Sequence, residues 1–447
     1  MRIKKGLDVP IIGAPEQQIY DGNPVKTVAL LGPNFGWIKP SMKVAVGDQV
    51  KRGQALFVDK QCPDITYASP GGGKVVAINR GHRRVLESVV IELDEDEQAV
   101  QFDKHKPEEL AGLSVEKIRE QLTSSGGWTC FRTRPYSKVP HSSDTPRSIF
   151  VTAMDSNPLA ADASVIINDA KEDFYNGLAL ISKLTEGPTY VCKYPGGDMP
   201  GADIENVRFE DFEGPHPAGN AGTHIHFLDP VSSEKSVWTI NYQDVISIGK
   251  LFINGERSPN RVVSLAGPGV KKPRLVRTRI GANLQELTAD ELNFDDCRVI
   301  SGSLLSGDNA EDSFSFLGRY HTQVTVLHEG RDREILGWLI PKFDKFSFAR
   351  VNLSALTPSR LFNLTTNRNG SYRAMVPIGT YEAVVPLDVL PTQLLRALLV
   401  MDTDSAQALG ALELDEEDLS LCSFVCHSKY NYGEALRENL TKIEKEG

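Results

Sequence analysis

The sequence predicts a multidomain fold of mixed α+β and α/β class, and three observations support this prediction. The chain has 447 residues, enough for three or four domains that each bury a core. Its opening part consists of short strand-forming runs separated by glycine turns, its middle part alternates strand and helix patterns, and its end is helical. We therefore expect domains at residues 1–100, 101–256, 257–330 and 331–447.

Composition limits the class of function. Apolar residues make up 40% of the chain and charged residues 24%, as in ordinary soluble globular proteins. The formal net charge of −10 should repel nucleic acid and anionic lipid unless a local basic patch overrides it. No apolar run approaches the roughly 20 residues that span a bilayer, so we expect membrane association only through partner proteins. The 6 cysteines are mostly far apart, which favours a reducing cytoplasm.

The sequence pattern of the opening domain is clearest at residues 44–76, where valine-rich runs alternate with the turns Gly47-Asp48 and Arg52-Gly53. The pattern V-x-V-G-D-x-V-x-x-G-Q-x-L resembles the barrel-sandwich fold of lipoyl and biotinyl carrier domains. Carriers of that family bear their cofactor on a lysine at a hairpin tip, near the place of Lys60. The hairpin here is longer and lacks the methionine-flanked lysine of biotin carriers, so we favour a docking barrel over a modified Lys60.

Two loops combine aromatic and cationic residues. Residues 126–138 read GGWTCFRTRPYSK, and residues 35–39 read FGWIK. Such loops can cover the edge of a flat aromatic or quinone ring, with Arg or Lys donating hydrogen bonds to its oxygens. The alternative is a surface loop whose aromatic residues cover the core and whose cations stay solvated. The quinone-adjacent candidates are Phe35, Trp37, Lys39, Phe131, Arg132, Arg134, Tyr136 and Lys138.

The second domain contains a strand–helix–strand crossover unit. Strand patterns at residues 148–151 and 189–192 flank a helix pattern at 171–184, which predicts a parallel sheet. Ligands of such sheets bind at the carboxyl ends of the strands, so Asp155, Ser156 and Asn157 form a candidate small-molecule loop, together with the turn at 194–198. Neither strand is followed by a glycine-rich phosphate loop, and nucleotide binding is therefore not supported.

Two short motifs invite a metal interpretation. Residues 222–229 alternate like a strand and place His224 and His226 on one face, with Asp229 as a possible third ligand. The same residues are also typical of a structural role, in which the histidines form hydrogen bonds between two domains. We therefore predict no metal site. Cys422 and Cys426 offer two thiolates where a four-iron cluster needs four, so buried reduced thiols are favoured.

The third domain changes composition from residue 261. Strand patterns at 262–265 and 275–279 and a short helix pattern at 284–292 resemble a soluble-ligand-binding β-grasp (SLBB) domain. Its cations can bind an acidic partner or the lipid surface beside one, or they can form a solvated strand face. These cations are Lys271, Lys272, Arg274, Arg277 and Arg279. The final domain is predicted to be helical, with a leucine seam after Pro391.

Several long segments together resemble one family. They are IKKGLDVPI, VTAMDSNPLAAD, GTHIHFLDPV, NYQDVISIGKLF, RVVSLAGPGVKKPRLVRTRIGA and the end from MDTDSAQALGALELDEEDLSLCSFVC to KYNYGEALRENLTKIEKEG. Throughout its length the chain is similar to the A subunits of bacterial sodium-translocating NADH:quinone oxidoreductases. That family is related to the C subunit of Rnf-type oxidoreductases and, in its middle domains, to the FMN-binding subunit of respiratory complex I. The resemblance implies a flavin-subunit-like, Rossmann-like α/β domain and a degenerate ferredoxin-like helical end. His427 stands where the family commonly has proline.

The resemblance also implies a function and partners. The expected protein is a peripheral subunit on the cytoplasmic face of the bacterial inner membrane, with five other subunits, B to F. The complex would pass electrons from NADH to ubiquinone and export sodium. FMN, riboflavin, FAD and 2Fe-2S are expected in the partner subunits and none in this chain, which shows no electron-carrier motif and no catalytic residue of its own. The alternatives are a free-standing flavin-binding oxidoreductase and a lipoyl-like carrier protein.

Overall fold

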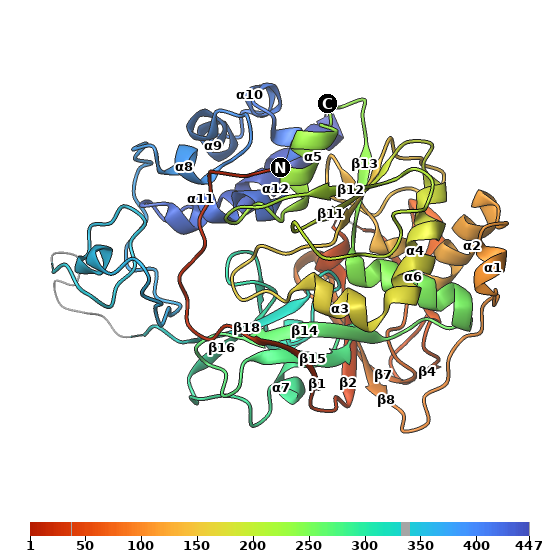
Figure 1. Cartoon of the computed structure of the whole chain (residues 1–447). Helices are drawn as coiled ribbons and strands as arrows, with labels where there is room; N and C mark the ends of the chain where they lie inside the picture. The colour runs from red at the N-terminus through yellow and green to blue at the C-terminus, as the bar shows by residue number, and fades with distance from the viewer. Residues whose placement is uncertain (37, 332–339, 447) are drawn as a thin grey trace.

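Four β-sheets and a helical C-terminal region make up the molecule (Figure 1). The computed structural model describes residues 1–36, 38–331 and 340–446. The sheets have six, five, four and three strands. The C-terminal helices lie together at the top left of Figure 1, and the N-terminal segment runs from them down to the sheet at the bottom.

The two smaller sheets build the predicted β-rich opening unit. One has the order β2-β8-β7-β4 and the other β3-β5-β6. Their strands are β2 (Thr27–Leu31), β3 (Pro40–Met42), β4 (Gln49–Val50), β5 (Ala55–Asp59), β6 (Cys62–Ala68), β7 (Gly73–Arg80) and β8 (Leu86–Leu93). Apolar side chains such as Val28, Leu56 and Val75 are fully buried between them. Lys60 lies at the tip of the β5–β6 hairpin, as the sequence predicted.

The five-stranded sheet confirms the predicted crossover unit. Its order is β12-β11-β10-β13-β9, and all pairs are parallel except that of β9 with β13. Its strands are β9 (Arg132–Arg134), β10 (Ile149–Thr152), β11 (Thr189–Lys193), β12 (Val207–Asp211) and β13 (Val237–Asn241). The accompanying helices are α1 (Pro107–Leu110), α2 (Val115–Ser125), α3 (Ala163–Asp169), α4 (Lys171–Ile181) and α6 (Tyr242–Asn254). Helices α4 and α6 pack closely against each other because glycines stand at their contact.

The predicted strand at residues 222–229 is wrong. This segment is helix α5 (Ala221–Leu228), which follows Asn220 in extended conformation. Its alternating histidines match the strand period, but tertiary contacts favour a helix here. The Asn220 side chain donates to Glu417 and Asp418, and His226 contacts Glu413. Two residues apart on a helix, His224 and His226 point in different directions.

The six-stranded sheet has the order β1-β15-β14-β18-β16-β17. Its strands are β1 (Glu16–Asp21), β14 (Asn260–Ala266), β15 (Arg274–Arg279), β16 (Cys297–Ser301), β17 (Asp308–Asn309) and β18 (Gln323–His328), and helix α7 (Leu284–Leu287) packs beside it. Strand β1 pairs in parallel with β15, so this N-terminal segment does not belong to the barrel sheets. Local sequence could not reveal this pairing, because its two partners are more than 250 residues apart.

The C-terminal region ends in helices, as predicted, and the first of them begins at Thr380. Its helices are α8 (Thr380–Val384), α9 (Pro391–Leu399), α10 (Thr403–Ala408), α11 (Ser420–Val425) and α12 (Tyr432–Glu446), with a 3-10 turn η8 (Glu416–Leu419). They share a core that includes Leu395, Cys422 and Leu436. In the described part of the chain, no helix is both long enough and apolar enough to cross a membrane.

Candidate functional site

The two candidate loops converge on a tyrosine that the sequence analysis did not single out. Phe35 ends the 3-10 turn η1 (Gly32–Phe35), and Arg132 begins β9. The Phe35 ring lies 6.3 Å from the ring of Tyr320, and the guanidinium carbon of Arg132 lies 4.9 Å from the same ring centroid. Tyr67 adds an edge-on contact to Phe35 at 4.9 Å. We call Phe35, Tyr67, Arg132, Arg319 and Tyr320 the Tyr320 cluster.

Tyr320 lies just before β18 and is held from two sides. Its hydroxyl donates to the carbonyl of Thr129 at 3.0 Å, and the guanidinium carbon of Arg319 lies 5.5 Å from its ring centroid. Burial raises the pKa of Tyr320 to about 12, against the opposing effect of Arg132 and Arg319. The phenol therefore stays protonated at neutral pH and can act only as a neutral hydrogen-bonding group.

Two donors in the Tyr320 cluster have no partner. The Nε atoms of Arg132 and Arg319 are buried and make no hydrogen bond to any described residue. A buried donor without an acceptor costs about 1–3 kcal/mol. The cluster thus combines aromatic rings with unused N–H groups, and an oxygen-bearing planar ligand would suit both.

A buried ion-pair network lies behind the Tyr320 cluster. Asp244 on α6 accepts from Arg261 Nη2 at 2.9 Å and from Arg319 Nη1 at 3.0 Å. Burial alone would raise the pKa of Asp244, but the two guanidinium groups outweigh it and lower that pKa. Arg319 also donates to Cys130 Sγ at 2.9 Å. This network joins the second domain to the six-stranded sheet.

A third arginine makes the region around Asp244 electropositive. Arg257 is buried, and its Nη1 donates a long hydrogen bond to the carbonyl of Ser125 at 3.4 Å. Burial, followed by the like charge of Arg319, lowers the pKa of Arg257 to about 10. At neutral pH, Arg257, Arg261 and Arg319 therefore surround a single carboxylate and leave excess positive charge.

Other members of the candidate set lie elsewhere. Phe131 is fully buried and packs between Trp128 and Trp238, with ring centroids 5.6 Å and 5.3 Å away. Arg134 is also buried, and its Nη2 lies 3.1 Å from a carboxylate oxygen of Asp415. These two residues thus serve the core and the contact between β9 and the C-terminal region.

Of the remaining loop candidates, Tyr136 and Lys138 contact the C-terminal region, and Lys39 lies in the opening β-rich unit. The carbonyl of Tyr136 accepts from Arg437 at 2.6 Å, and Lys138 forms an ion pair with Glu444 on α12. Lys39 is exposed, and its backbone N–H donates to Asp59 at 3.2 Å. Trp37 lies outside the described residues.

The candidate loop after β10 is in the expected place. Asp155 accepts from the backbone and side-chain N–H groups of Asn157, both at 2.9 Å, and burial raises its pKa despite these bonds. Ser156 Oγ accepts from the backbone N–H of Gly219 at 2.7 Å. Tyr194, in the turn after β11, donates to the Asp155 carbonyl at 3.1 Å. The two predicted loops therefore meet at the carboxyl edge of the sheet.

The histidines of α5 make separate hydrogen bonds. His224 Nε2 lies 3.0 Å from the carbonyl of Ala218, and burial lowers its pKa to about 3. His226 Nδ1 lies 2.7 Å from Glu413, in the C-terminal region. Among the described residues, no group of three or more potential ligands is placed to hold a metal ion.

Cys422 and Cys426 are buried, as predicted. Burial raises the pKa of Cys422. The hydroxyl of Tyr381 donates to Cys426 Sγ at 3.2 Å, and Tyr432 lies 3.5 Å away, so that the pKa of Cys426 falls although burial opposes this. Both thiols therefore lie in the helical core, where packing and hydrogen bonds explain their presence.

Most cations of the basic strand β15 are already paired. Arg274 binds both carboxylate oxygens of Glu291, at 2.7 and 2.9 Å. Arg277 pairs with Asp169 at 2.8 Å, and Arg279 with Glu97 at 2.6 Å. Lys271 donates to the carbonyl of Asp290 at 2.9 Å. The charge of β15 thus mainly ties its sheet to neighbouring elements.

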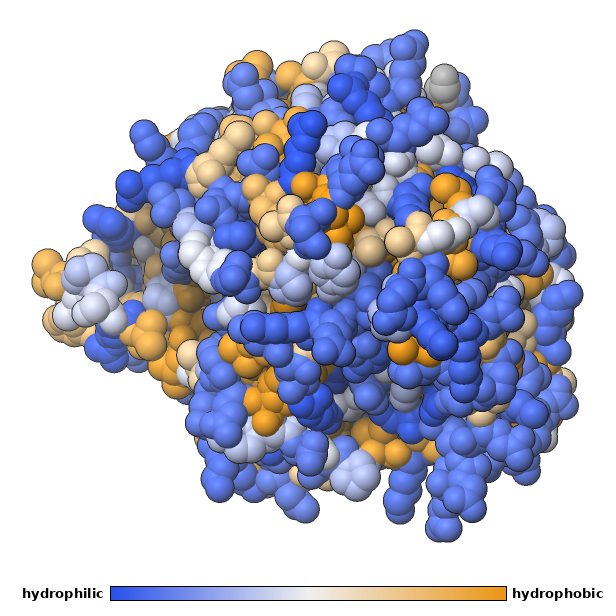
Figure 2. Space-filling model, turned by 45° about the vertical axis from the view of Figure 1, so that its right-hand side comes forward, coloured by the Kyte–Doolittle hydropathy of each residue, from blue (hydrophilic) through white to orange (hydrophobic). Residues whose placement is uncertain are grey.

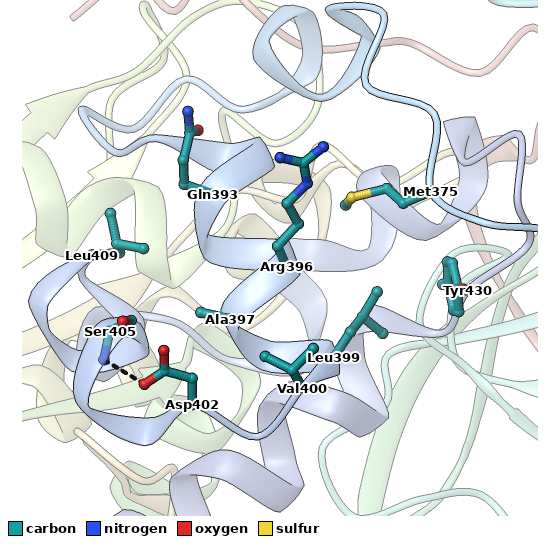
Figure 3. A pocket seen from close by; sticks show the side chains of 10 residues that line it. All are labelled: Met375, Gln393, Arg396, Ala397, Leu399, Val400, Asp402, Ser405, Leu409 and Tyr430. Carbon is teal, nitrogen blue, oxygen red and sulfur yellow. Dashed lines mark hydrogen bonds between the residues drawn. The ribbon is translucent and has the colours of Figure 1, made fainter.

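Surface grooves are found away from the Tyr320 cluster. The larger, of about 690 Å³, runs along α9 and α10 and is largely apolar (Figure 3). Arg396 and Met375 approach each other across one side of it, while Val400 and Leu399 lie on another. A smaller groove of about 380 Å³ lies beside Pro33 and Phe314.

Family models match three parts of the chain. Residues 1–94 match the NqrA N-terminal barrel-sandwich hybrid domain, and residues 113–257 match the NqrA second alpha/beta domain. Residues 262–312 match a model described as the NQRA C-terminal domain. Barrel-sandwich and α/β classes are therefore correct for the first two units.

Full-length relatives share a common name, as the A subunit of the Na(+)-translocating NADH-quinone reductase. The protein of Hahella chejuensis is 58% identical and that of Neisseria gonorrhoeae 55%, each over 100% of both chains. The protein of Histophilus somni is 56% identical over 100% of this chain and 99% of its own. A solved NAD+-reducing [NiFe]-hydrogenase chain covers 50% of this chain and 49% of its own, at 13% identity and a TM-score of 0.37, which is too low to support an argument. The chain belongs to the family of A subunits of the Na⁺-translocating NADH-quinone reductases, which are multi-subunit enzymes.

Proposed function

We propose that the chain assists the reduction of ubiquinone in a sodium-exporting NADH:ubiquinone reductase, and that the Tyr320 cluster forms or shields part of the quinone site. One observation carries this proposal. Arg132 stacks on the ring of Tyr320 while its Nε–H remains buried and unpaired. Relatives more than 50% identical along the whole chain are named for a quinone reductase, which supports the same substrate class.

The chemistry of a quinone fits this cluster. A quinone head group presents a flat apolar face and two carbonyl oxygens, which match aromatic rings and N–H donors. Uptake of one electron gives an anionic semiquinone. The excess positive charge of Arg257, Arg261 and Arg319 around Asp244 would stabilise that anion. The chain would thus favour the reduced forms of the quinone by electrostatics.

Electrons must then reach the quinone from partner subunits. We infer that this chain binds no redox cofactor and that FMN, riboflavin, FAD and 2Fe-2S reside in the other subunits. Cys426 is hydrogen-bonded and Cys422 is buried, and these two thiols are half of the four that a four-iron cluster needs. The role of this chain is then to position and shield the quinone rather than to conduct electrons.

The same proposal includes docking. We expect the barrel and the six-stranded-sheet domain to bind membrane-embedded subunits, among five other subunits, at the cytoplasmic face of the bacterial inner membrane. Co-purification of the untagged chain with integral membrane proteins tests this arrangement. A chain that never co-purifies with them would contradict it.

The quinone role is tested by Arg132→Lys in the assembled complex. Lysine keeps a charge for Asp415 but has no Nε–H beside Tyr320. Loss of one charge-assisted hydrogen bond of about 1.5–3 kcal/mol predicts a KM for quinone that is roughly tenfold to a hundredfold higher. NADH oxidation by an artificial acceptor should be unchanged.

Arg208→Lys, on the exposed edge strand β12, is the matched control and should leave the KM for quinone unchanged. Photoreactive quinone should label the Tyr320 cluster in the wild-type complex. An unchanged KM for Arg132→Lys, together with labelling confined to other subunits, would contradict the quinone role.

A further inference from the structure

One segment of the molecule leaves apolar side chains in solvent. Residues 340–379, here called the basic arm, have a single regular element, the 3-10 turn η6 (Leu353–Leu356). Among the described residues, the exposed large hydrophobic side chains concentrate here, and Val351 and Leu356 are 70% and 74% exposed. The basic arm projects at the left of Figure 1, and Figure 2 shows apolar surface on the corresponding projection.

The basic arm also has a charge opposite to that of the whole chain. It contains six Lys or Arg residues and one acidic residue, Asp344, in a protein of formal net charge −10. Four exposed arginines lie in no ion pair within the described part of the chain. They are Arg350, Arg360, Arg368 and Arg373. This differs from β15, whose arginines have acidic partners inside the molecule.

The basic arm is attached to the body at defined points. Phe362 is buried, and its backbone accepts from Ile12 at 3.0 Å and donates to Pro10 at 2.8 Å. Ser428 donates to the carbonyl of Ala374 at 2.7 Å. The exposed Arg368, Tyr372 and Arg373 lie between these two points, and the exposed Val351, Leu356 and Arg360 lie in the residues just before Phe362.

We propose that the basic arm binds the anionic lipid surface of the membrane. Cations spaced among exposed Val, Leu, Phe and Tyr side chains are the composition that binds at a lipid interface, where apolar groups enter the headgroup layer and cations meet lipid phosphates. This inference rests on the proposed function, which places the chain beside a bilayer in the cell.

A lipid surface suits the basic arm better than a protein surface. Its apolar side chains stand singly along an irregular backbone, whereas a specific protein interface requires a packed and complementary centre. A fluid headgroup layer accepts each side chain separately. The net charge of the rest of the molecule opposes binding to anionic lipid, so the attraction must be local to the basic arm.

The test uses the purified full-length chain in vesicle flotation. Vesicles of phosphatidylcholine with phosphatidylglycerol should bind it, vesicles of phosphatidylcholine alone should bind it at least tenfold less, and added salt should weaken binding. Changing the four exposed arginines to glutamine should lower binding to the anionic vesicles at least tenfold. Val351→Ser with Leu356→Ser, which retains every charge, should also weaken binding.

A matched control removes the same number of exposed charges from the body of the molecule. Its substitutions are Lys51→Gln, Lys74→Gln, Lys117→Gln and Lys235→Gln, and it should bind as the wild type does. Circular dichroism and thermal melting verify that each variant is folded.

Several results would overturn the proposal. They include equal binding of the wild-type chain to neutral and anionic vesicles, and equal loss of binding in the arginine variant and the lysine control. If the arginine variant binds vesicles normally but no longer co-purifies with the membrane subunits, the basic arm binds protein instead. Failure on vesicles with intact co-purification contradicts the lipid inference alone and leaves the proposed function standing.

Discussion

Single residues hold the domains together, and Asp244 shows this most directly. It is 1% exposed and neutralises part of the charge of Arg261 and Arg319. Asp244→Asn would leave buried guanidinium groups without a counter-charge. We expect the free energy of unfolding to fall by about 3–5 kcal/mol, measured by urea denaturation.

The control for Asp244 is a more exposed ion pair. Asp173 and Lys250 lie 3.7 Å apart, each 28% exposed. Asp173→Asn should cost less than about 1 kcal/mol, because solvent screens such pairs. Equal losses in the two variants would contradict the role given to the Asp244 network.

At this scale the sequence predicted part of the candidate site. The aromatic and cationic composition pointed to Phe35 and Arg132, which the fold brings to one ring. Tyr320 also follows a cation, Arg319, so the same kind of signal was present in the sequence, but its partners Phe35 and Arg132 come from two other domains and local sequence could not reveal them. The partners of Arg134 and Lys138 were equally hidden, since both lie in the last 33 residues.

Helix α4 packs on α6 through two glycines. A Cβ atom on Gly177 would lie 2.0 Å from the carbonyl oxygen of Val245, and one on Gly249 would lie 2.0 Å from that of Asp173. Gly177→Ala should therefore lower the free energy of unfolding by about 1–3 kcal/mol, although alanine favours helices. Urea denaturation measures the loss.

Gly112→Ala provides the comparison, because the nearest atom to its added Cβ would be 3.5 Å away. We expect a change within about 0.5 kcal/mol. A stabilised Gly177→Ala protein would mean that the two helices can separate without cost.

Elements with a clear period were predictable, and those set by tertiary contacts were not. The strands β10 and β11 and the helix α4 stand where apolar patterns placed them. The strand prediction for the residues of helix α5 was wrong because eight residues carry little periodic information. Its histidines are held by contacts with Ala218 and Glu413, which the local sequence does not show.

The stability of the whole molecule should depend on pH through carboxyl groups at the contact between β9 and the C-terminal region. Burial raises the pKa of Asp418 to about 6, despite the charge of Arg134. Partial burial and the neighbouring carboxylates of Asp415 and Asp418 raise the pKa of Glu416 to about 7 and that of Glu417 to about 8. The folded state therefore holds protons that the unfolded state has lost. The free energy of unfolding should fall as pH rises from about 4.5 to about 8.

Asp418→Asn tests this dependence. Asparagine at this position mimics the protonated acid, so the difference in unfolding free energy between about pH 5 and about pH 8 should shrink by about 1–2 kcal/mol. Asp404→Asn, in α10 and away from this contact, should leave the difference unchanged. If the Asp418→Asn protein kept the full pH dependence of the unfolding free energy, other titrating groups would have to cause it.

The threading of residues 1–21 governs how the molecule can be assembled. Ile3 packs in the second domain, Gly6 donates to the Ala383 carbonyl at 3.1 Å, and β1 pairs with β15. During translation this segment leaves the ribosome long before any of those partners exists. The partners of Ile3 and of β1 lie in the first two thirds of the polypeptide, but the contact of Gly6 with Ala383 cannot form until the last fifth is made. Docking of residues 1–21 is therefore a late step of folding. A bulky fusion before residue 1 should slow folding more than one placed after α12.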